Sequence, residues 1–127
     1  MIAIDSSAFI AYLQNETNHI TEKVERALET NNAILPPVVV VELLSDPILS
    51  AEVIYNIAAL PTLEPKPGYW IRAGKTRSVI LKRKLKARLA DTLIAQMCID
   101  YNIPLLTMDN DFKNFVKYCG LKLMYSL

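Results

Sequence analysis

The sequence predicts an α/β fold, a three-layer α/β/α sandwich around a mainly parallel central sheet. Two observations favour this class: short apolar segments alternate with longer helical patterns, and short connections join them. The chain has 127 residues, 52% of them hydrophobic, which is enough for a sizeable core. With no linker or internal repeat, residues 1–127 are expected to form a single domain.

The first half of the chain is expected to contain two strands and four helices. "MIAID" is predicted to be a buried strand ending at Asp5, and Ser6 or Ser7 can cap a helix over "SAFIAYLQN". An amphipathic helix over "HITEKVERALETN" precedes a short strand, "AILPP". "VVVVELLSD" is predicted to be helical despite its valines, because a strand directly after Pro36 and Pro37 leaves no room for a turn. "AEVIYNIAAL" follows as another apolar helix.

The second half continues the alternation. "TLEPKPG" is a loop with room for a short strand, and a long helix is expected from Tyr69 to about Lys84. "ADTLIAQMCIDYN" is a clear helix that begins near Asp91, and "IPLLTMD" is the next strand. A final helix over "DFKNFVKYC" and a closing strand, "LKLMY", complete the predicted order.

Total charge, cysteines and hydropathy give few indications of function. The formal net charge is +1, so it identifies no partner. Cys98 and Cys119 lack a CxxC spacing and are expected to be separate reduced thiols. The N-terminus lacks the basic region of a signal peptide, and the apolar runs fall short of the roughly 18 residues that span a bilayer. These features predict a soluble cytoplasmic protein without a membrane partner.

Acidic residues occur where parallel α/β sheets bind ligands, beyond the carboxyl ends of the strands. Asp5 and Asp109 each end a predicted strand, Asp91 begins a helix, and Glu42 lies early in the helix after the second strand. These four carboxylates are therefore predicted to converge, with Asp111 as a further candidate. Taken singly, each has a simpler explanation as a helix cap or a solvated residue.

Several carboxylates in one place repel each other and raise one another's pKa unless a cation neutralises them. Mg²⁺ or Mn²⁺ suits a site made of oxygen ligands. Such an ion can activate a water for attack on a phosphodiester and stabilise the leaving oxygen. General-base chemistry by histidine is not expected, because His19 is the only histidine and lies far in sequence from the acids.

A run of basic residues precedes Asp91. No acidic residue occurs from position 65 to position 90, whereas this stretch holds more than half of the 14 Lys and Arg. The run is either a solvated helical face or a surface that binds RNA phosphates. Tyr69 and Trp70 could stack on bases or pack within the protein. The candidate RNA-binding residues are Arg72, Lys75, Arg77, Lys82, Arg83, Lys84, Lys86 and Arg88.

Four stretches of the sequence match a known family: "MIAIDSSAFIAYL", "PPVVVVELL", "LADTLIAQMCIDYNIPLLTMDNDF" and "GLKLM". With these motifs nearly the whole chain resembles a PIN domain, and its length and order are similar to VapC-type toxins of toxin–antitoxin pairs. It implies the three-layer fold and a helical "VVVVELL". It also implies that the residues holding Mg²⁺ or Mn²⁺ are Asp5, Glu42, Asp91 and Asp109, that Asp111 is the second aspartate of a DxD motif, and that Ser6 and Thr107 are supporting hydroxyls.

The same resemblance implies a metal-dependent endoribonuclease that cleaves RNA by metal-activated water. It further implies a toxin that forms homodimers and is held inactive by an antitoxin. The alternative from the residues themselves is a non-catalytic PIN-like module that binds RNA or protein, with acids that only cap helices. A receiver-like phosphorylation domain is not favoured, because it would need an acid pair near the first strand and a lysine ending a late strand.

Overall fold

Three short parallel strands form the centre of the computed structural model, which describes residues 1–125. The strands are β1 (Ile2–Ile4), β2 (Ala33–Ile34) and β3 (Leu105–Leu106), in the order β2–β1–β3. Ala3 of β1 pairs with Ile34 on one side and with Leu105 on the other. Because β1 is central and covered on both faces, Ala3 and Ile4 are fully buried, as expected for a parallel sheet.

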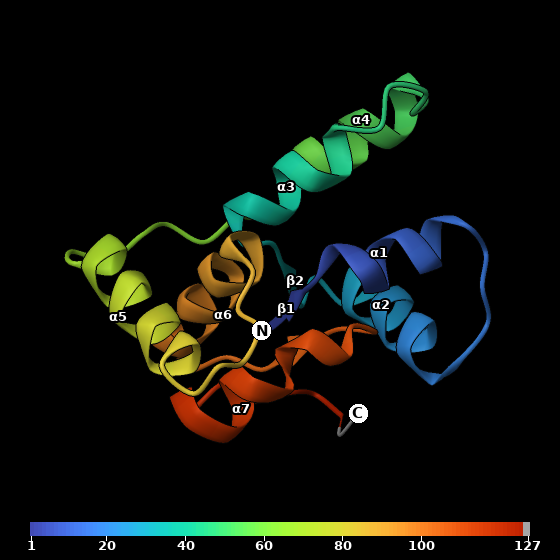
Figure 1. Cartoon of the computed structure of the whole chain (residues 1–127). Coiled ribbons are helices and arrows are strands. Elements are labelled where there is room, and N and C mark those ends of the chain that lie inside the picture. Colours follow the sequence, from blue (N-terminus) through green and yellow to red (C-terminus); the bar gives the residue numbers. More distant parts are fainter. Residues whose placement is uncertain (126–127) are drawn as a thin grey trace.

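Helices cover both faces of this sheet. The first crossover, from β1 to β2, contains α1 (Ser6–Leu13) and α2 (His19–Glu29). The return crossover to β3 contains α3 (Pro37–Leu44), α4 (Ala51–Ala58), α5 (Tyr69–Leu81) and α6 (Leu89–Tyr101), and the turn η1 (Asn110–Phe112) and α7 (Lys113–Cys119) follow β3. The two crossovers run in opposite directions along the sheet, so right-handed connections place them on opposite faces. Figure 1 shows α1 and α2 on one side of the sheet and α5 and α6 on the other, which confirms the predicted three layers.

The four valines of "VVVVELL" are helical, as predicted. Pro37 occupies the first turn of α3, where its missing N–H is not needed, and Val39 and Leu43 are buried one turn apart. Val41 lies on the opposite face and is 67% exposed. The helix buries one apolar stripe and leaves Glu42 on the accessible side. In Figure 1, α3 and α4 project from the body of the molecule.

The ends of two predicted elements differ from expectation. The closing strand over residues 121–125 is reduced to a single bridge between Leu123 and Leu105, so the prediction of a full strand there was wrong. Helix α5 ends at Leu81 because Lys84 adopts a left-handed conformation (φ 62°) and the next amide turns back to Ile80 O. The predicted short strand in "TLEPKPG" corresponds to an isolated bridge between Thr62 and Leu35.

Cys98 is buried, Cys119 is half-buried, and both are free thiols. Among the helices of residues 1–125, none combines the length and the apolar character needed to cross a bilayer.

Candidate metal centre

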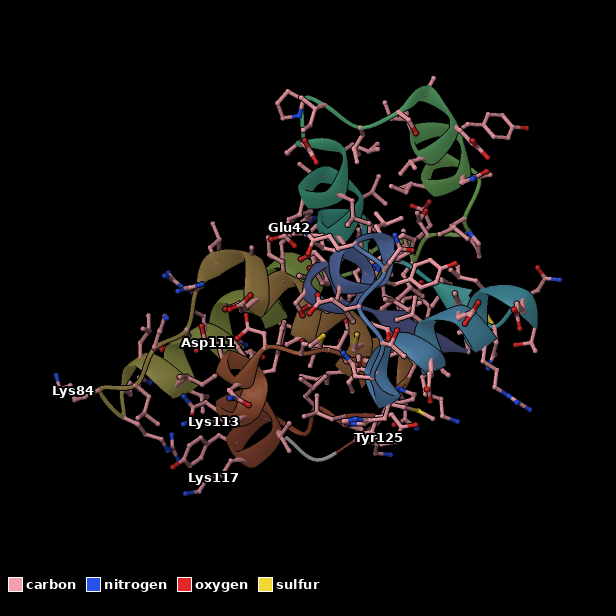
Figure 2. The ribbon with its side chains drawn as sticks, turned by 90° about the vertical axis from the view of Figure 1, so that its right-hand side faces the viewer. Glu42, Lys84, Asp111, Lys113, Lys117 and Tyr125 are labelled. Carbon is pink, nitrogen blue, oxygen red and sulfur yellow. The ribbon has the colours of Figure 1, made fainter. Side chains whose placement is uncertain are left out.

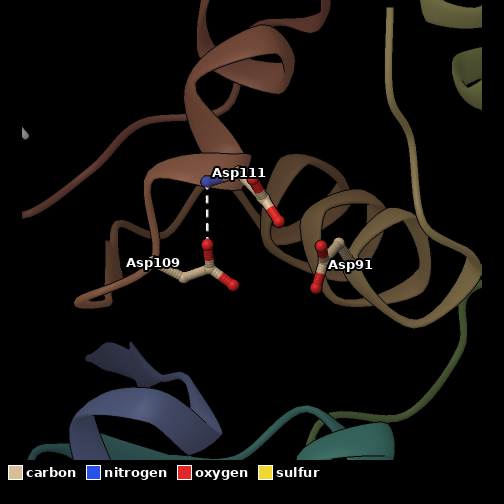
Figure 3. A group of neighbouring side chains, drawn as sticks. All are labelled: Asp91, Asp109 and Asp111. Atoms are coloured by element: carbon tan, nitrogen blue, oxygen red, sulfur yellow. Dashed lines mark hydrogen bonds between the residues drawn. The ribbon is translucent and has the colours of Figure 1, made fainter.

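Three aspartates meet at the carboxyl edge of the sheet. One carboxylate oxygen from each of Asp91, Asp109 and Asp111 lies within 4.8 Å of the other two (Figure 3). Asp109 follows β3, and its Oδ1 accepts a hydrogen bond of 2.8 Å from the backbone N–H of Asp111. Asp91 reaches the same place from the first turn of α6. Segments that are far apart in the sequence thus bring three carboxylates together.

Asp91 has the least satisfied side chain of the three. Its Oδ2 is buried and has no hydrogen-bond partner among the described residues. Burial, which has the largest effect, and the charges of Asp109, Asp5 and Asp111 together raise the pKa of the Asp91 carboxyl to about 6, against an opposing effect of Arg88. A buried oxygen without a donor is costly, because it has lost its water and gained no partner. A cation bound at this oxygen would remove that cost.

Asp5 directly follows β1 and is held by two hydroxyls. Its side chain is 3% exposed, and its Oδ2 accepts hydrogen bonds from Ser7 Oγ at 2.7 Å and Thr107 Oγ1 at 2.8 Å. The same two hydroxyls accept the backbone N–H groups of Met108 and Asp109, each at 3.0 Å. Burial raises the pKa of Asp5, and the hydrogen bonds from the two hydroxyls oppose it. The hydroxyls therefore couple the end of β1 to the turn after β3.

Glu42 approaches from α3. Its Oε1 accepts a hydrogen bond of 3.0 Å from Ser6 Oγ. Burial raises the pKa of Glu42, the hydrogen bond from Ser6 opposes it, and the charges of Asp5 and Asp109 raise it. Glu42 therefore lies close enough to these two aspartates to feel their charges, although it lies outside the group of three.

Ser6 and Thr107 were predicted to be hydroxyls that support the acids. In the structure Ser6 donates a hydrogen bond to Glu42, and Thr107 donates one to Asp5. Ser7 was considered only as a helix cap, whereas its hydroxyl bonds Asp5. The signal available in the sequence was the second serine of "DSS", only two residues after Asp5.

The predicted RNA-binding residues have different surroundings. Lys86 Nζ donates to Asp111 Oδ2 at 3.1 Å, and Arg88 Nη1 lies 3.7 Å from the same oxygen. Arg72 instead forms an ion pair with Asp100 at 2.6 Å, at the far end of α6. The five remaining side chains support local structure or face solvent: Arg77 donates to Ala87 O, Arg83 donates to Val79 O, and Lys75, Lys82 and Lys84 are exposed.

Two exposed lysines outside the predicted basic run, Lys113 and Lys117, follow Asp111 in the sequence. Lys113 and Lys117 are exposed on α7, four residues apart and therefore on one helical face. Figure 2 shows Asp111 with Glu42 above it and these two lysines below it on the side facing the viewer. The sequence signal for these lysines was their position two and six residues after Asp111, the second aspartate of the DxD motif.

The aromatic pair at the start of α5 divides between the core and the surface. Tyr69 is 2% exposed, and its hydroxyl donates to Leu93 O at 2.6 Å. Burial raises the pKa of Tyr69 to about 12, so this side chain packs within the protein. Trp70 is 66% exposed and available to a partner. His19 is exposed on α2, where its ring lies against Tyr125.

These carboxylates form a set of ligands that suits a hard divalent cation. All the candidate ligands are carboxylate oxygens, as Mg²⁺ and Mn²⁺ prefer. The five acids carry a formal charge of −5, which Lys86 and Arg88 offset only in part, and the buried Asp91 Oδ2 lacks a donor. The residues present therefore fit a magnesium or manganese site.

The comparisons with known proteins agree with this arrangement. A model of the PIN domain family matches residues 2–118, and the chain belongs to this family. No curated protein matches it in sequence.

Solved structures share its fold. A chain of VapBC-1 from nontypeable Haemophilus influenzae superposes with a TM-score of 0.76 at 20% identity, covering 98% of this chain and 97% of that one. A chain of VapBC2 from Rickettsia felis, solved bound to a DNA fragment from the promoter, gives 0.73 at 19% identity, covering 97% of both. VapBC-5 from Mycobacterium tuberculosis, a member of a family of toxin–antitoxin systems, gives 0.66 at 16% identity, covering 98% and 97%. At these identities the similarity establishes the PIN fold.

Proposed function

We propose that this protein is a Mg²⁺- or Mn²⁺-dependent endoribonuclease. The observation that carries the proposal is the meeting of the Asp91, Asp109 and Asp111 carboxylates, together with a buried Asp91 oxygen that has no hydrogen-bond donor among the described residues. The residues that would hold the ion are Asp5, Glu42, Asp91 and Asp109, with Asp111 at the rim. When bound, the ion would lower the pKa of a water and stabilise the oxygen that leaves the phosphodiester.

The protein's own side chains would position the reaction. Ser7 and Thr107 fix one oxygen of Asp5, so that its other oxygen can face the ion. Ser6 orients Glu42 in the same way. Lys86 and Arg88 stand at the rim of the acidic centre, where an RNA phosphate would otherwise be repelled by the carboxylates. Binding of RNA should therefore depend strongly on salt.

We also propose that the protein is the toxin of a type II toxin–antitoxin pair and forms a homodimer. The solved relatives in VapBC complexes support an antitoxin partner. The projecting α3–α4 hairpin supports a protein partner as well, because five large apolar residues are exposed there, among them Val41 (67%), Ile48 (87%) and Tyr55 (74%). Apolar exposure of this kind is typical of interaction surfaces.

One experiment tests the nuclease function. Purified wild-type protein should cleave RNA with Mg²⁺ or Mn²⁺ and not with EDTA, as seen on a denaturing gel. Asp109→Asn should abolish this cleavage, whereas Lys122→Ala, which removes an exposed lysine bonded to Asn102 at the far end of α6, should keep it. Cleavage that survives EDTA, or that Asp109→Asn leaves unchanged, would contradict the proposal. RNA binding without cleavage in either metal would favour a non-catalytic binding module.

A further inference from the structure

The loop between α5 and α6, residues 82–88, brings two cations to the rim of the acidic centre. The Lys86 ammonium and the Arg88 guanidinium both face one oxygen, Asp111 Oδ2, at 3.1 and 3.7 Å. The three side chains are partly open to solvent, with exposed fractions of 55% for Lys86, 60% for Arg88 and 34% for Asp111. Asp111 is therefore the member of the acidic cluster that is bound on its outer side by basic residues.

The backbone of this loop is fixed so that these two residues face outward. Ala87 is 4% exposed, Leu85 packs against the core, and Arg77 Nε donates to Ala87 O at 2.8 Å. Alternate side chains of an extended segment point to opposite sides. With residues 85 and 87 turned inward, Lys86 and Arg88 project toward Asp111.

Asp111 is fixed from its other side. Its backbone N–H donates to Asp109 Oδ1 at 2.8 Å, and the next residue, Phe112, is fully buried in the core. Its carboxylate thus contacts the two cations of the loop and also lies close to the Asp91 and Asp109 carboxylates. A residue in this position can link the metal centre to the surface that meets RNA.

We propose that Asp111 is a positioning residue that holds Lys86 and Arg88 in place to bind RNA phosphates. The inference rests on the proposed nuclease function. Ion pairs that are open to solvent contribute little to stability, so either cation can pass from the carboxylate to a phosphate at small cost. Both Lys and Arg bind phosphate through charge-assisted hydrogen bonds.

The first test measures Mn²⁺ affinity by titration calorimetry, without RNA. Asp111→Asn should weaken binding by no more than the roughly tenfold that loss of an outer partner of a metal site costs, whereas Asp109→Asn, which removes a proposed ligand, should weaken binding by well over tenfold. An Asp111→Asn protein that loses Mn²⁺ affinity as fully as Asp109→Asn would make Asp111 a ligand and overturn the inference.

The second test measures RNA affinity in EDTA, where cleavage cannot occur, by fluorescence anisotropy of a labelled single strand over a series of salt concentrations. Each cation that binds a phosphate contributes about 0.7 to the slope of log K against log salt. The double variant Lys86→Ala/Arg88→Ala should therefore lower the slope by about 1.4, and Lys122→Ala should leave it unchanged. An unchanged slope in the double variant would overturn the inference.

A third measurement tests the coupling. Asp111→Asn should lower kcat/KM for RNA by up to about fivefold in the wild-type background, through misplaced cations, because an ion pair open to solvent contributes no more than about 1 kcal/mol. It should have little effect in the double variant, where the cations are already gone. Equal effects in both backgrounds would contradict the positioning role. A wild-type protein that binds Mn²⁺ and RNA but does not cleave would count against the nuclease function alone, since the first two tests still decide the role of Asp111.

Discussion

Helix α6 carries an aspartate at each end, and the two have opposite surroundings. Asp91 lies in the first turn, where the helix dipole favours a carboxylate, yet burial and neighbouring carboxylates raise its pKa to about 6. Asp100 lies in the last turn, where the dipole is unfavourable. Burial alone would raise the pKa of Asp100, but hydrogen bonds from Arg72 and Gln96 outweigh burial and lower it.

The difference shows that direct partners outweigh the helix dipole in this protein. Both oxygens of Asp100 are bonded, Oδ1 by Arg72 Nε (3.0 Å) and Gln96 Nε2 (2.9 Å), and Oδ2 by Arg72 Nη2 (2.6 Å). Asp91 has a buried oxygen without any donor in the described part of the chain. A carboxylate that only supports the fold is fully paired here, and the one kept without a partner is the one proposed to meet a cation.

The largest expected effect is on RNA cleavage, when the aspartate at each end of α6 is replaced in turn by the neutral asparagine. Asp91→Asn should lower RNA cleavage by roughly 10²–10³-fold, because it removes an anionic ligand of the proposed ion. Asp100→Asn, the matched control on the same helix, should keep cleavage within about threefold of the wild type. Initial rates of cleavage of a labelled RNA at saturating Mn²⁺ measure both. Equal losses would show that the two ends of α6 do not differ in function.

The same pair of variants should have opposite effects on stability without metal. Asp91→Asn removes a charge that lacks a partner, so in EDTA at pH 7 it should raise Tm by roughly 3–5 °C, which corresponds to about 1 kcal/mol. Asp100→Asn loses the charge that Arg72 binds and should lower Tm. Thermal unfolding followed by circular dichroism measures the shift, and a lower Tm for Asp91→Asn would contradict the unpartnered state of its carboxylate.

The next effect is on pH dependence. Below pH 6 the proton on Asp91 competes with the ion, so Mn²⁺ affinity should fall by about tenfold per pH unit. The stability of the metal-free protein changes with pH in the opposite direction to Mn²⁺ affinity. Folding raises the pKa of Asp91 from 3.8 to about 6, so the contribution of this carboxyl to the free energy of unfolding is present below pH 3.8 and is lost as pH rises through 6. Calorimetric titrations between pH 5 and 7.5, repeated with Asp91→Asn, test this, and affinity that stays constant over that range would contradict it.

A smaller effect should follow from loss of the ion pair at the other end. Arg72→Met leaves the nearly buried Asp100 carboxylate with Gln96 as its remaining side-chain partner and should lower Tm by about 5 °C at pH 7. The lowered pKa of Asp100 gives stability that is present above pH 3.8 and lost as pH falls through its folded value, and this acid-dependent loss should shrink in the variant. Urea unfolding from pH 3 to 7 measures it. Cleavage activity should not change, and a large loss would show that this pair also supports the metal centre.

Much of the site followed from rules that link topology to sequence. Carboxylates after parallel strands must point to one edge of the sheet, so the positions of Asp5 and Asp109 could be predicted from two short apolar runs. The helical "VVVVELL" could be predicted as well, because Pro37 suits a helix start and Val39 and Leu43 repeat at helical spacing.

The roles within the basic run could not be predicted in this way. Arg72 and Arg88 belong to the same run in sequence, yet Arg72 pairs with Asp100 and Arg88 faces Asp111. The choice is made by contacts between segments more than twenty residues apart, which local spacing does not record. The prediction of a closing strand was wrong for a related reason. The segment "LKLMY" has the composition of a strand, but only its Leu123 pairs with β3, which is two residues long.

The smallest expected effect compares the adjacent serines that serve two different carboxylates. Ser7→Ala removes a donor to buried Asp5 and should destabilise the protein by about 1 kcal/mol, with a further rise in the pKa of Asp5. Ser6→Ala removes a donor to the more accessible Glu42, where water can replace the hydroxyl, and should change stability by less than about 0.5 kcal/mol. Urea unfolding in EDTA measures both. If Ser6→Ala lowered the free energy of unfolding more than Ser7→Ala, burial of the carboxylate would not determine how much its hydrogen-bond donor stabilises the protein. That result would contradict the comparison of Asp91 with Asp100.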